Sequence, residues 1–280
     1  MKETRIHVNN AQYQKFEVLR GNRNKRFRCG SFLVEGVRNI NEAIRNNWVI
    51  ESFLYSFETK LSGWATNLLE TVRTQENFAL TAPMMAGLSG KTDTSELLAI
   101  VKMKEENPDQ IKLSENPVLV LFDRPSNKGN LGTLIRSCDA LGVDGLIVTG
   151  HAVDPYDPET ITASMGSFFK VPVIRIANHE DLLAYMSELK TAYPELTIAG
   201  TSAHGEKAVF QHDFTKPAMI MIGNETEGLS FHLQNKCDLM LTIPMAANSS
   251  ATSLNVACAA SVVFYEIARQ RAGGGMEGLL

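Results

Sequence analysis

Two carboxylates and two glycines directly follow an apolar run in the segment IMIGNETEGLS, residues 220–230. The apolar run predicts a buried strand, and Gly223, Glu225, Glu227 and Gly228 come where that strand ends. A glycine lets a ligand approach the backbone closely, and a carboxylate accepts hydrogen bonds or orients a cation. The segment therefore indicates a strand end that delivers groups to a ligand.

A second strand end with unusual chemistry lies in DRPSNKGNLGTLIRSCDALG, residues 123–142. The chain passes from a strand to a helix through small and polar residues, with Asn130 as a candidate helix cap. Arg136 comes four positions after Gly132 and is predicted to project back toward the loop. The alternative for this segment alone is an ordinary glycine turn followed by a surface arginine.

The third segment is LTIPMAANSSATSLNVACAA, residues 241–260. Its strand ends at Ile243–Pro244–Met245, a polar loop follows, and a long helix is predicted to begin at about Ser253 with Asn255 in its first turn. Three strand ends rich in asparagine or glycine, carrying one arginine and one or two carboxylates, suggest a shared pocket.

The elements that must bring these segments together alternate regularly from Pro117 onward. Apolar runs alternate with helical segments, which predicts an α/β fold with a parallel sheet covered by helices on both faces. Ligands in such sheets bind at the carboxyl ends of the strands. The predicted strands are VLVLF, GLIVTG, VPVIRI, LTIAGT, AMIMIG and LMLTIPM.

The N-terminal part predicts a smaller α/β unit. Residues 31–56 have the pattern of strand, helix and strand, and further helical and strand-like segments continue to about residue 106. Two prolines among polar residues make 107–116 the predicted linker. The expected organisation is a first domain over 1–106, a second over 117–271, and a glycine-rich flexible tail over 272–280.

Charge is unevenly distributed along the chain. The net charge is −4, yet residues 1–30 hold eight basic side chains and only two acidic ones. Arg23, Lys25, Arg26 and Arg28 surround Phe27, a composition suited to phosphate contacts and one stacked base. A solvated basic face that binds nothing is the alternative.

Several familiar kinds of site are missing from the sequence. No G-x-G-x-x-G, G-x-x-x-x-G-K-[ST] or G-x-S-x-G motif is present. The six histidines lack metal-binding spacing, and the four cysteines form no C-x-x-C pair, so we expect no metal and reduced thiols. No apolar stretch is long enough to cross a bilayer and the N-terminus lacks a signal peptide, so a cytoplasmic protein is expected.

The three segments resemble, in sequence and order, the three motifs of the SpoU (TrmH-like) branch of the SPOUT RNA methyltransferases. The resemblance covers about residues 117–271 and rests on NLGTLIRSCDALG, IMIGNETEGLS and IPM followed by SLNVACAASVVFYE, with ASMGSFFKVPV as an intermediate segment. FLVEGVRNINEAI and GLSGKTDTSELLAIV resemble the substrate-binding domain that many of these enzymes carry, a small α/β domain related to ribosomal RNA-binding proteins.

This resemblance implies a fold and a reaction. The second domain would contain a deep trefoil knot at its C-terminal end and would bind S-adenosylmethionine there. The enzyme would be a homodimer with its site near the interface. It would transfer a methyl group to a ribose 2′-hydroxyl of structured RNA, and the separate N-terminal domain favours ribosomal RNA over transfer RNA.

The resemblance also implies roles for particular residues. Arg136 would either activate the 2′-hydroxyl as a base or polarise it and grip the adjacent phosphate, with Glu227 orienting the guanidinium. The implied active-site set is Asn130, Arg136, Glu227 and Asn255. The implied cofactor-binding set is Thr201, Ile222, Gly223, Ile243, Met245 and Leu254. The expected RNA-binding set is Arg23, Lys25, Arg26, Arg28, Arg38 and Lys128.

Two other functions are compatible with these residues. One keeps the fold and cofactor but methylates a base; the intact Asn130, Arg136 and Asn255 set instead favours the ribose. The other is a non-catalytic RNA-binding or ribosome-assembly protein, which predicts that Arg136→Ala leaves function unchanged. The chain departs from the family pattern in its long DRPSNKGNLG turn, in the polar loop AANSSAT, and in TDTSELLAIV, which lacks a Pro-Gln-Gly sequence.

Overall fold

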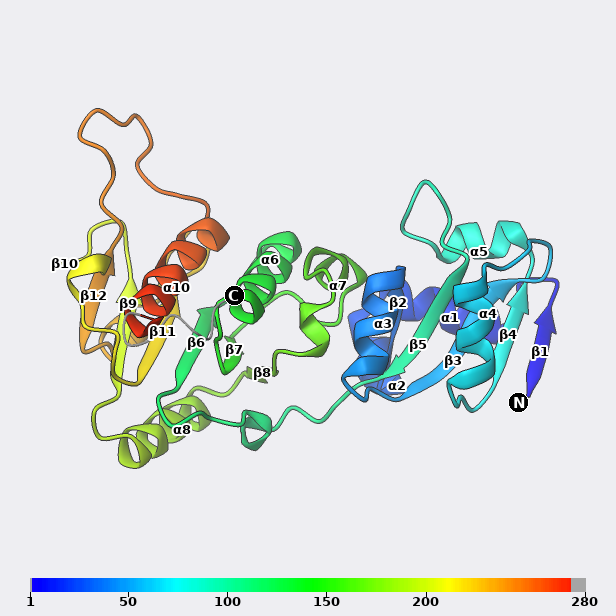
Figure 1. The fold of residues 1–280 in the computed structure, drawn as a ribbon, viewed down its shortest axis with the longest axis horizontal. Coiled ribbons are helices and arrows are strands. Elements are labelled where there is room, and N and C mark those ends of the chain that lie inside the picture. The colour runs from blue at the N-terminus through cyan, green and yellow to red at the C-terminus, as the bar shows by residue number, and fades with distance from the viewer. Residues whose placement is uncertain (1, 273–280) are drawn as a thin grey trace. The chain divides into compact units, whose positions relative to one another are not determined.

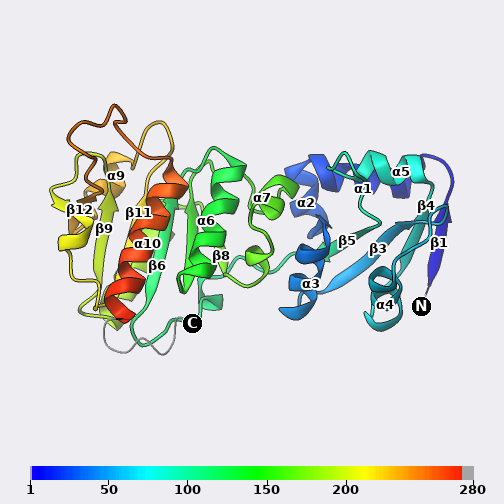
Figure 2. The ribbon, with the colours of Figure 1, turned by 45° about the horizontal axis from the view of Figure 1, so that its top comes forward.

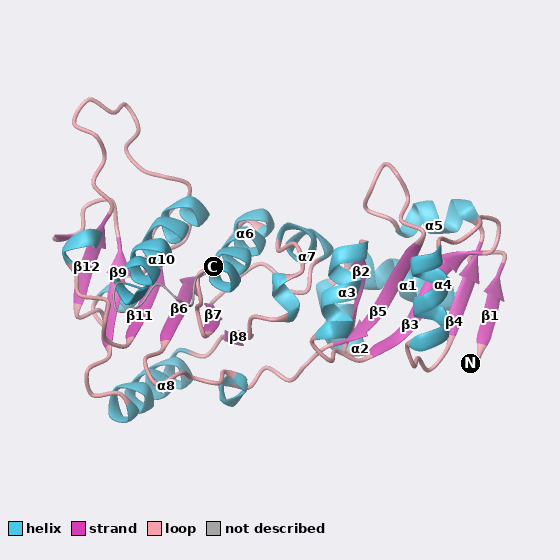
Figure 3. Ribbon diagram, viewed as in Figure 1, coloured by secondary structure: helices cyan, strands magenta, loops and turns pink. Residues whose placement is uncertain are grey.

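The computed structural model describes residues 2–272, and these form two compact units (Figures 1 and 3). The first unit combines residues up to 105 with residues 154–170. The second combines 106–153 with the chain from 171 onward. Apart from Ala272, the predicted tail over 272–280 lies outside the described residues.

The first unit contains a five-stranded mixed sheet in the order β1-β4-β3-β5-β2. Strand β5 is antiparallel to its neighbours β3 and β2, and the other pairs are parallel. The predicted strand, helix and strand over 31–56 are confirmed as β2, α3 and β3. The bounds are β1 (Glu3–Ile6), α1 (Ala11–Gly21), α2 (Arg23–Cys29), β2 (Ser31–Glu35), α3 (Val37–Arg45), β3 (Ile50–Ser56), α4 (Gly63–Thr71), β4 (Asn77–Leu80), α5 (Ala82–Leu88) and β5 (Leu97–Lys102).

The basic segment near the N-terminus forms α2, and one of its arginines is not on the surface. Arg26 is 1% exposed, and its Nε donates to Asp154 Oδ2 at 2.8 Å. Its terminal nitrogens reach the Asp157 carboxylate at 3.2 Å and the carbonyl oxygens of Leu19 and Arg20 at 3.0 and 2.9 Å. The prediction that Arg26 contacts RNA was wrong, because these partners hold the guanidinium inside the unit.

Residues 154–170 complete the core of this first unit. They include α7 (Pro158–Ala163) and the short 3-10 helix η2 (Ser167–Phe169). Phe32, Trp48, Tyr156, Phe168 and Phe169 form a cluster with ring centroids between 4.9 and 6.3 Å apart, and Trp48 Nε1 donates to the Phe169 carbonyl at 2.8 Å. A segment that the sequence groups with the second domain therefore shares an aromatic core with the first unit.

The second unit contains a seven-stranded, wholly parallel sheet in the order β10-β12-β9-β11-β6-β7-β8. All six predicted strands are present. The bounds are η1 (Pro108–Gln110), β6 (Val118–Asp123), α6 (Lys128–Ala140), β7 (Gly145–Thr149), β8 (Val173–Ile176), α8 (His179–Ala192), β9 (Thr197–Thr201), β10 (Lys207–Ala208), η3 (Val209–Gln211), β11 (Ala218–Ile222), α9 (Phe231–Gln234), β12 (Leu239–Thr242) and α10 (Val256–Ala272).

Helices cover both faces of this sheet, as predicted. Helices α6 and α10 lie side by side on one face (Figure 2), where Ser137 and Ser261 share a hydrogen bond of 2.7 Å. On the other face, α8 buries Leu182, Met186 and Leu189 among the apolar side chains of the strands. The knotted path stays a prediction. No helix in the range 2–272 is long and apolar enough to span a membrane.

The strand order reverses direction next to β6. From β6 the chain builds outward through β7 and β8, and it then continues on the opposite side with β9, β11 and β12. Such a switch point separates neighbouring loops at the carboxyl ends of the strands and leaves room for a ligand. The three chemically unusual segments follow β6, β11 and β12.

We predict that Arg26→Met lowers the free energy of unfolding of the first unit by about 3–5 kcal/mol, because Asp154 then loses its partner while buried. Both tryptophans, Trp48 and Trp64, belong to this unit, so their fluorescence during chemical denaturation reports its stability. The adjacent exposed Lys25 provides the matched control, and Lys25→Met is expected to change stability by less than about 0.5 kcal/mol. Equal effects of the two changes would contradict the prediction.

Candidate functional site

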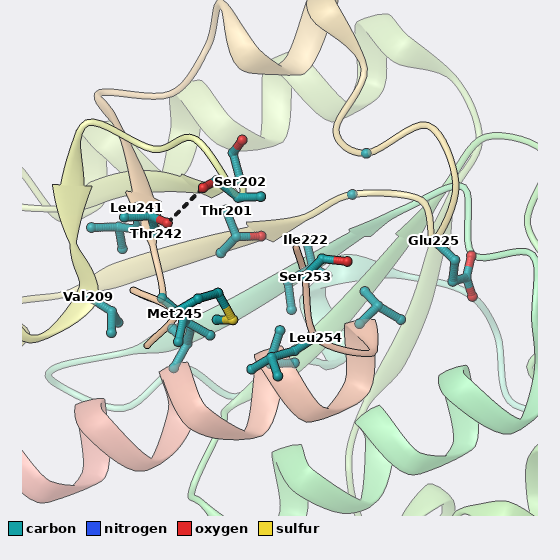
Figure 4. A pocket seen from close by; sticks show the side chains of 18 of the residues that line it. Thr201, Ser202, Val209, Ile222, Glu225, Leu241, Thr242, Met245, Ser253 and Leu254 are labelled. Atoms are coloured by element: carbon teal, nitrogen blue, oxygen red, sulfur yellow. Dashed lines mark hydrogen bonds between the residues drawn. The ribbon is translucent and has the colours of Figure 1, made fainter. Parts of the chain in front are cut away.

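A pocket of about 540 Å³ lies where β9, β11 and β12 end and α10 begins (Figure 4). The segments after these strands supply most of its wall, and α10 closes one side. All six residues of the predicted cofactor set line this single pocket: Thr201, Ile222, Gly223, Ile243, Met245 and Leu254. Two of the three predicted strand ends, after β11 and β12, therefore converge on one cavity, and the end of β9 takes the place predicted for the segment after β6.

The pocket wall combines apolar surface with a few polar groups. Val209, Leu241 and Val263 supply aliphatic surface, while Thr201 and Ser202 bring hydroxyl groups. The Thr201 hydroxyl donates to the Met221 carbonyl at 3.1 Å. This lining suits a ligand that has an apolar or aromatic body and a small number of polar atoms.

Gly223 cannot be replaced by a larger residue without moving the backbone. A Cβ atom there would lie 2.0 Å from the Leu229 backbone nitrogen and 2.2 Å from the Gly228 carbonyl carbon. Gly228 itself has a φ of +70°, which favours glycine. The two glycines let the chain fold back tightly at the end of β11, where residues 222–224 line the pocket.

A polar network beside the pocket joins the segments after β6 and β11. The two carboxylate oxygens of Glu225 accept hydrogen bonds from the Ser126 backbone and hydroxyl (2.9 and 2.7 Å), the Asn127 backbone (3.1 Å) and Asn130 Nδ2 (3.2 Å). Asn255 Nδ2 then donates to Asn130 Oδ1 at 3.1 Å. Side chains from all three predicted motifs therefore meet at Asn130.

Helix capping differs from the prediction in a way that frees Asn130. Helix α6 is capped by Asn127, whose Oδ1 accepts from the Asn130 backbone at 2.9 Å. Helix α10 begins at Val256 rather than near Ser253, and Asn255 Oδ1 accepts from the Ala257 backbone at 2.9 Å. With Asn127 as the cap, the Asn130 side chain is available to Glu225 and Asn255.

The environment of Glu225 favours its charged form. Burial, the largest single effect, raises the pKa, but the hydrogen bonds from Ser126 and Asn130 lower it, and the net result is a pKa below the usual value. The carboxylate is therefore ionised near neutral pH and acts as an acceptor for the loop after β6.

Glu227 lies apart from the Asn130 network, and its catalytic role stays a prediction. Its side chain is 67% exposed and forms an ion pair with Arg124, while Glu225 makes the contacts to the Asn130 network. Glu225, which lines the pocket and binds Asn130, was not among the predicted active-site residues. The sequence placed both carboxylates in the same segment, and only the turn geometry decides which one faces Asn130.

The other predicted residues lie outside the pocket wall. Arg136 is exposed on α6 and belongs neither to the pocket lining nor to the Asn130 network. Lys25, Arg28 and Arg38 are exposed in the first unit, Arg23 there is half-buried, and Lys128 is half-buried at the start of α6. Within residues 2–272 no group of three or more histidine, cysteine, aspartate or glutamate side chains could hold a metal ion.

Comparison with protein families gives two matches along the chain. Residues 117–265 match the model of the SpoU rRNA Methylase family. Residues 10–99 match the SpoU L30e-like domain. The first match contains the residues that line the pocket and the network around Asn130, and the second contains most of the first unit.

Known proteins are similar over nearly the whole chain. A 23S rRNA (uridine(2479)-2′-O)-methyltransferase from Streptomyces viridochromogenes is 44% identical over 96% of this chain and 93% of its own length. The 23S rRNA (guanosine(2553)-2′-O)-methyltransferase RlmP from Bacillus subtilis is 28% identical over 87% of this chain and 90% of its own length. The crystal structure of the SpoU methyltransferase AviRb from Streptomyces viridochromogenes in complex with AdoMet matches with a TM-score of 0.89 and 44% identity, covering 94% of this chain and 98% of that one. This chain belongs to the SpoU rRNA methylase family.

Proposed function

We propose that this protein transfers a methyl group from S-adenosylmethionine to a ribose 2′-hydroxyl of ribosomal RNA, with 23S rRNA as the substrate. The observation that carries the proposal is the pocket in which all six expected cofactor positions meet, next to the Glu225–Asn130–Asn255 network. The two relatives described above act on the ribose of a uridine and of a guanosine. The reaction that they share is at the sugar, which argues against base methylation.

The pocket fits S-adenosylmethionine in size and chemistry. A volume of about 540 Å³ falls within the range of small-molecule sites, roughly 300–1,000 Å³. The aliphatic side chains suit an adenine ring, and the backbone around Gly223 with the Thr201 and Ser202 hydroxyls suits the polar atoms of a nucleoside and an amino acid. When bound, this cofactor supplies a methyl group that its sulfonium has already activated.

The task that remains for the protein is to align and polarise the 2′-hydroxyl. Asn130 and Asn255 hold each other in place beside the pocket, and Glu225 fixes Asn130 from the other side. Arg136 polarises the 2′-oxygen and grips the neighbouring phosphate. Because Arg136 is exposed on α6 outside the pocket wall, we propose that it acts in a homodimer, where a second copy completes the site.

Exposed basic side chains in the first unit would hold the RNA backbone. Lys25 and Arg28 on α2 and Arg38 on α3 are exposed, and Arg23 is half-buried. Lys128, which is half-buried at the start of α6, is the member of the set that belongs to the second unit. Arg26 is excluded from this set because it is buried against Asp154. The proposed substrate-binding domain is the N-terminal one, residues 1–106.

The function is tested by methyl transfer from labelled S-adenosylmethionine to 23S rRNA from cells that lack this protein, followed by nucleoside mass spectrometry. We expect one 2′-O-methylnucleoside with the wild type and a loss on the order of 10²-fold or more in kcat with Arg136→Ala, because the positioned cation is removed. Lys60→Ala, a change of an exposed cation outside the proposed set, is the control and is expected to retain activity. Label on a base, or full activity of Arg136→Ala, would contradict the proposal.

Glu225 and Asn130 are expected to act as one unit. Glu225→Gln keeps the shape but adds a donor where Ser126, Asn127 and Asn130 all need an acceptor, so we expect kcat to fall roughly 100-fold through misplacement of Asn130. In the double variant of Glu225→Gln and Asn130→Ala, kcat should fall little further than in the more impaired of the two single variants. Kinetic constants of the four proteins test this, and fully additive losses would separate the two residues.

The proposed RNA contacts predict a change in salt dependence. Neutralising Lys25 and Arg28 should weaken 23S rRNA binding and flatten the plot of log K against log salt by about 0.7–0.9 for each phosphate that the protein no longer neutralises. Binding titrations at several salt concentrations measure this slope, with Lys60→Ala as the control. An unchanged slope would remove α2 from the RNA-binding surface.

A further inference from the structure

Arg124 lies between the loop after β6 and the turn after β11 and contacts both. Its guanidinium pairs with the carboxylates of Asp123, at 3.2 Å, and Glu227, and Nη2 donates to the Gly228 carbonyl at 3.3 Å. Its own carbonyl accepts from Asn224 Nδ2 at 2.7 Å. One residue therefore holds the turn 224–228 through its side chain and its backbone.

The backbone of Arg124 has an uncommon conformation, and its side chain depends on space beside Gly150. Its φ is +50°, in the left-handed region that non-glycine residues seldom occupy and that carries a conformational cost. A Cβ atom at Gly150 would lie 2.6 Å from Arg124 Cγ, so only a glycine there leaves space for the side chain. Both features are expected where surrounding contacts fix a conformation that the chain would otherwise avoid.

The partners of Arg124 are themselves fixed. Asp123 is 3% exposed, and its carboxylate accepts from the Thr149 hydroxyl at 3.0 Å and from the Ser230 backbone at 2.9 Å. Within the turn, Asn224 Oδ1 accepts from the Thr226 and Glu227 backbones at 2.9 and 3.1 Å. The contacts on the two sides of Arg124 thus connect the end of β6 to both ends of the turn.

This turn carries the groups that face the proposed cofactor and the proposed catalytic network. Gly223, Asn224, Glu225 and Gly228 line the pocket, and Glu225 also binds Asn130. We infer that Arg124 is a positioning residue that, with Glu227, sets the 223–228 turn for cofactor binding and for catalysis. Its role in catalysis rests on the proposed function, whereas its role in ligand binding can be measured without turnover.

An arginine suits this position better than a lysine. The planar guanidinium reaches a carboxylate on each side and the Gly228 carbonyl at once, while an ammonium is a point charge that cannot span all three in one geometry. Arg124→Lys should therefore behave more like Arg124→Ala than like the wild type. Glu227→Gln removes one charged partner and leaves the Gly228 contact, so a smaller effect is expected.

The test combines calorimetric binding of S-adenosylhomocysteine with steady-state kinetics on 23S rRNA and thermal unfolding. Arg124→Ala is expected to raise the Kd roughly tenfold or more, the effect of losing hydrogen bonds to a charged group, and to lower kcat. The KM for RNA should stay within about twofold, since the RNA-binding residues are untouched. In the double variant of Arg124→Ala and Glu227→Gln, the rise in Kd and the fall in kcat should not exceed those of Arg124→Ala alone.

Lys216→Ala is the matched control, because it removes an exposed lysine–glutamate ion pair of the same unit outside the pocket lining. Its Kd and kcat should equal those of the wild type. If Arg124→Ala does not fold, Glu227→Gln alone tests the inference, because the Glu227 side chain is exposed and its change should not prevent folding. A raised Kd in this variant would support the inference.

Each other outcome overturns the inference in a distinct way. An unchanged Kd with Arg124→Ala or with Glu227→Gln would show that the contacts between Arg124 and the 223–228 turn do not shape the pocket. A loss of kcat in Glu227→Gln at unchanged Kd would make Glu227 a catalytic residue, as the sequence first suggested. A raised KM for RNA at unchanged Kd would make Arg124 an RNA contact. Absence of methyl transfer by the wild type would instead contradict the proposed function and leave the Kd comparison valid.

Discussion

The carboxylate of Glu225 joins two strand ends that are 99 residues apart in sequence, and the site depends on that connection. Adjacent parallel strands β6 and β11 bring the two segments to the same edge of the sheet, but they leave unpaired backbone N–H groups where α6 begins. Glu225 accepts from the backbone N–H of the cap residue Asn127, from that of Ser126 just before it, and from Asn130 Nδ2. An ionised carboxylate near a helix N-terminus is favourable, so satisfying the helix start and orienting Asn130 are achieved by the same interaction.

The elements of the second unit were largely predictable because a buried parallel strand has a simple signature. Each apolar run from VLVLF to LMLTIPM became a strand, and the rule that ligands bind at carboxyl ends located the pocket. The expected cofactor positions came from the resemblance, and they meet because β9, β11 and β12 end beside one another where α10 begins. The order of the strands could not be derived from periodicity, since a pattern fixes which segments are strands but not their neighbours.

Individual side chains were harder to assign, for physical reasons that differ from case to case. Arg26 lies within a run of basic residues, and only its distant partners Asp154 and Asp157 make it a core residue. Glu225 and Glu227 are two residues apart, so a tight turn points them in different directions, and the sequence does not contain the turn geometry. Asn127 and Asn130 are both good helix caps by type, and the one that capped α6 determined which side chain was left for the site.

The site and the sheet beneath it are held by different forces. Beneath the strands, α8 covers a continuous apolar cluster whose burial contributes about 25 cal/mol for each Å² removed from water. The 223–228 turn instead relies on hydrogen bonds and on partly exposed charges, each of which contributes little by itself. Its resting conformation is then set less by apolar burial than by steric exclusion: the missing Cβ at Gly223, the space at Gly150 and the left-handed backbone of Arg124 allow few alternatives.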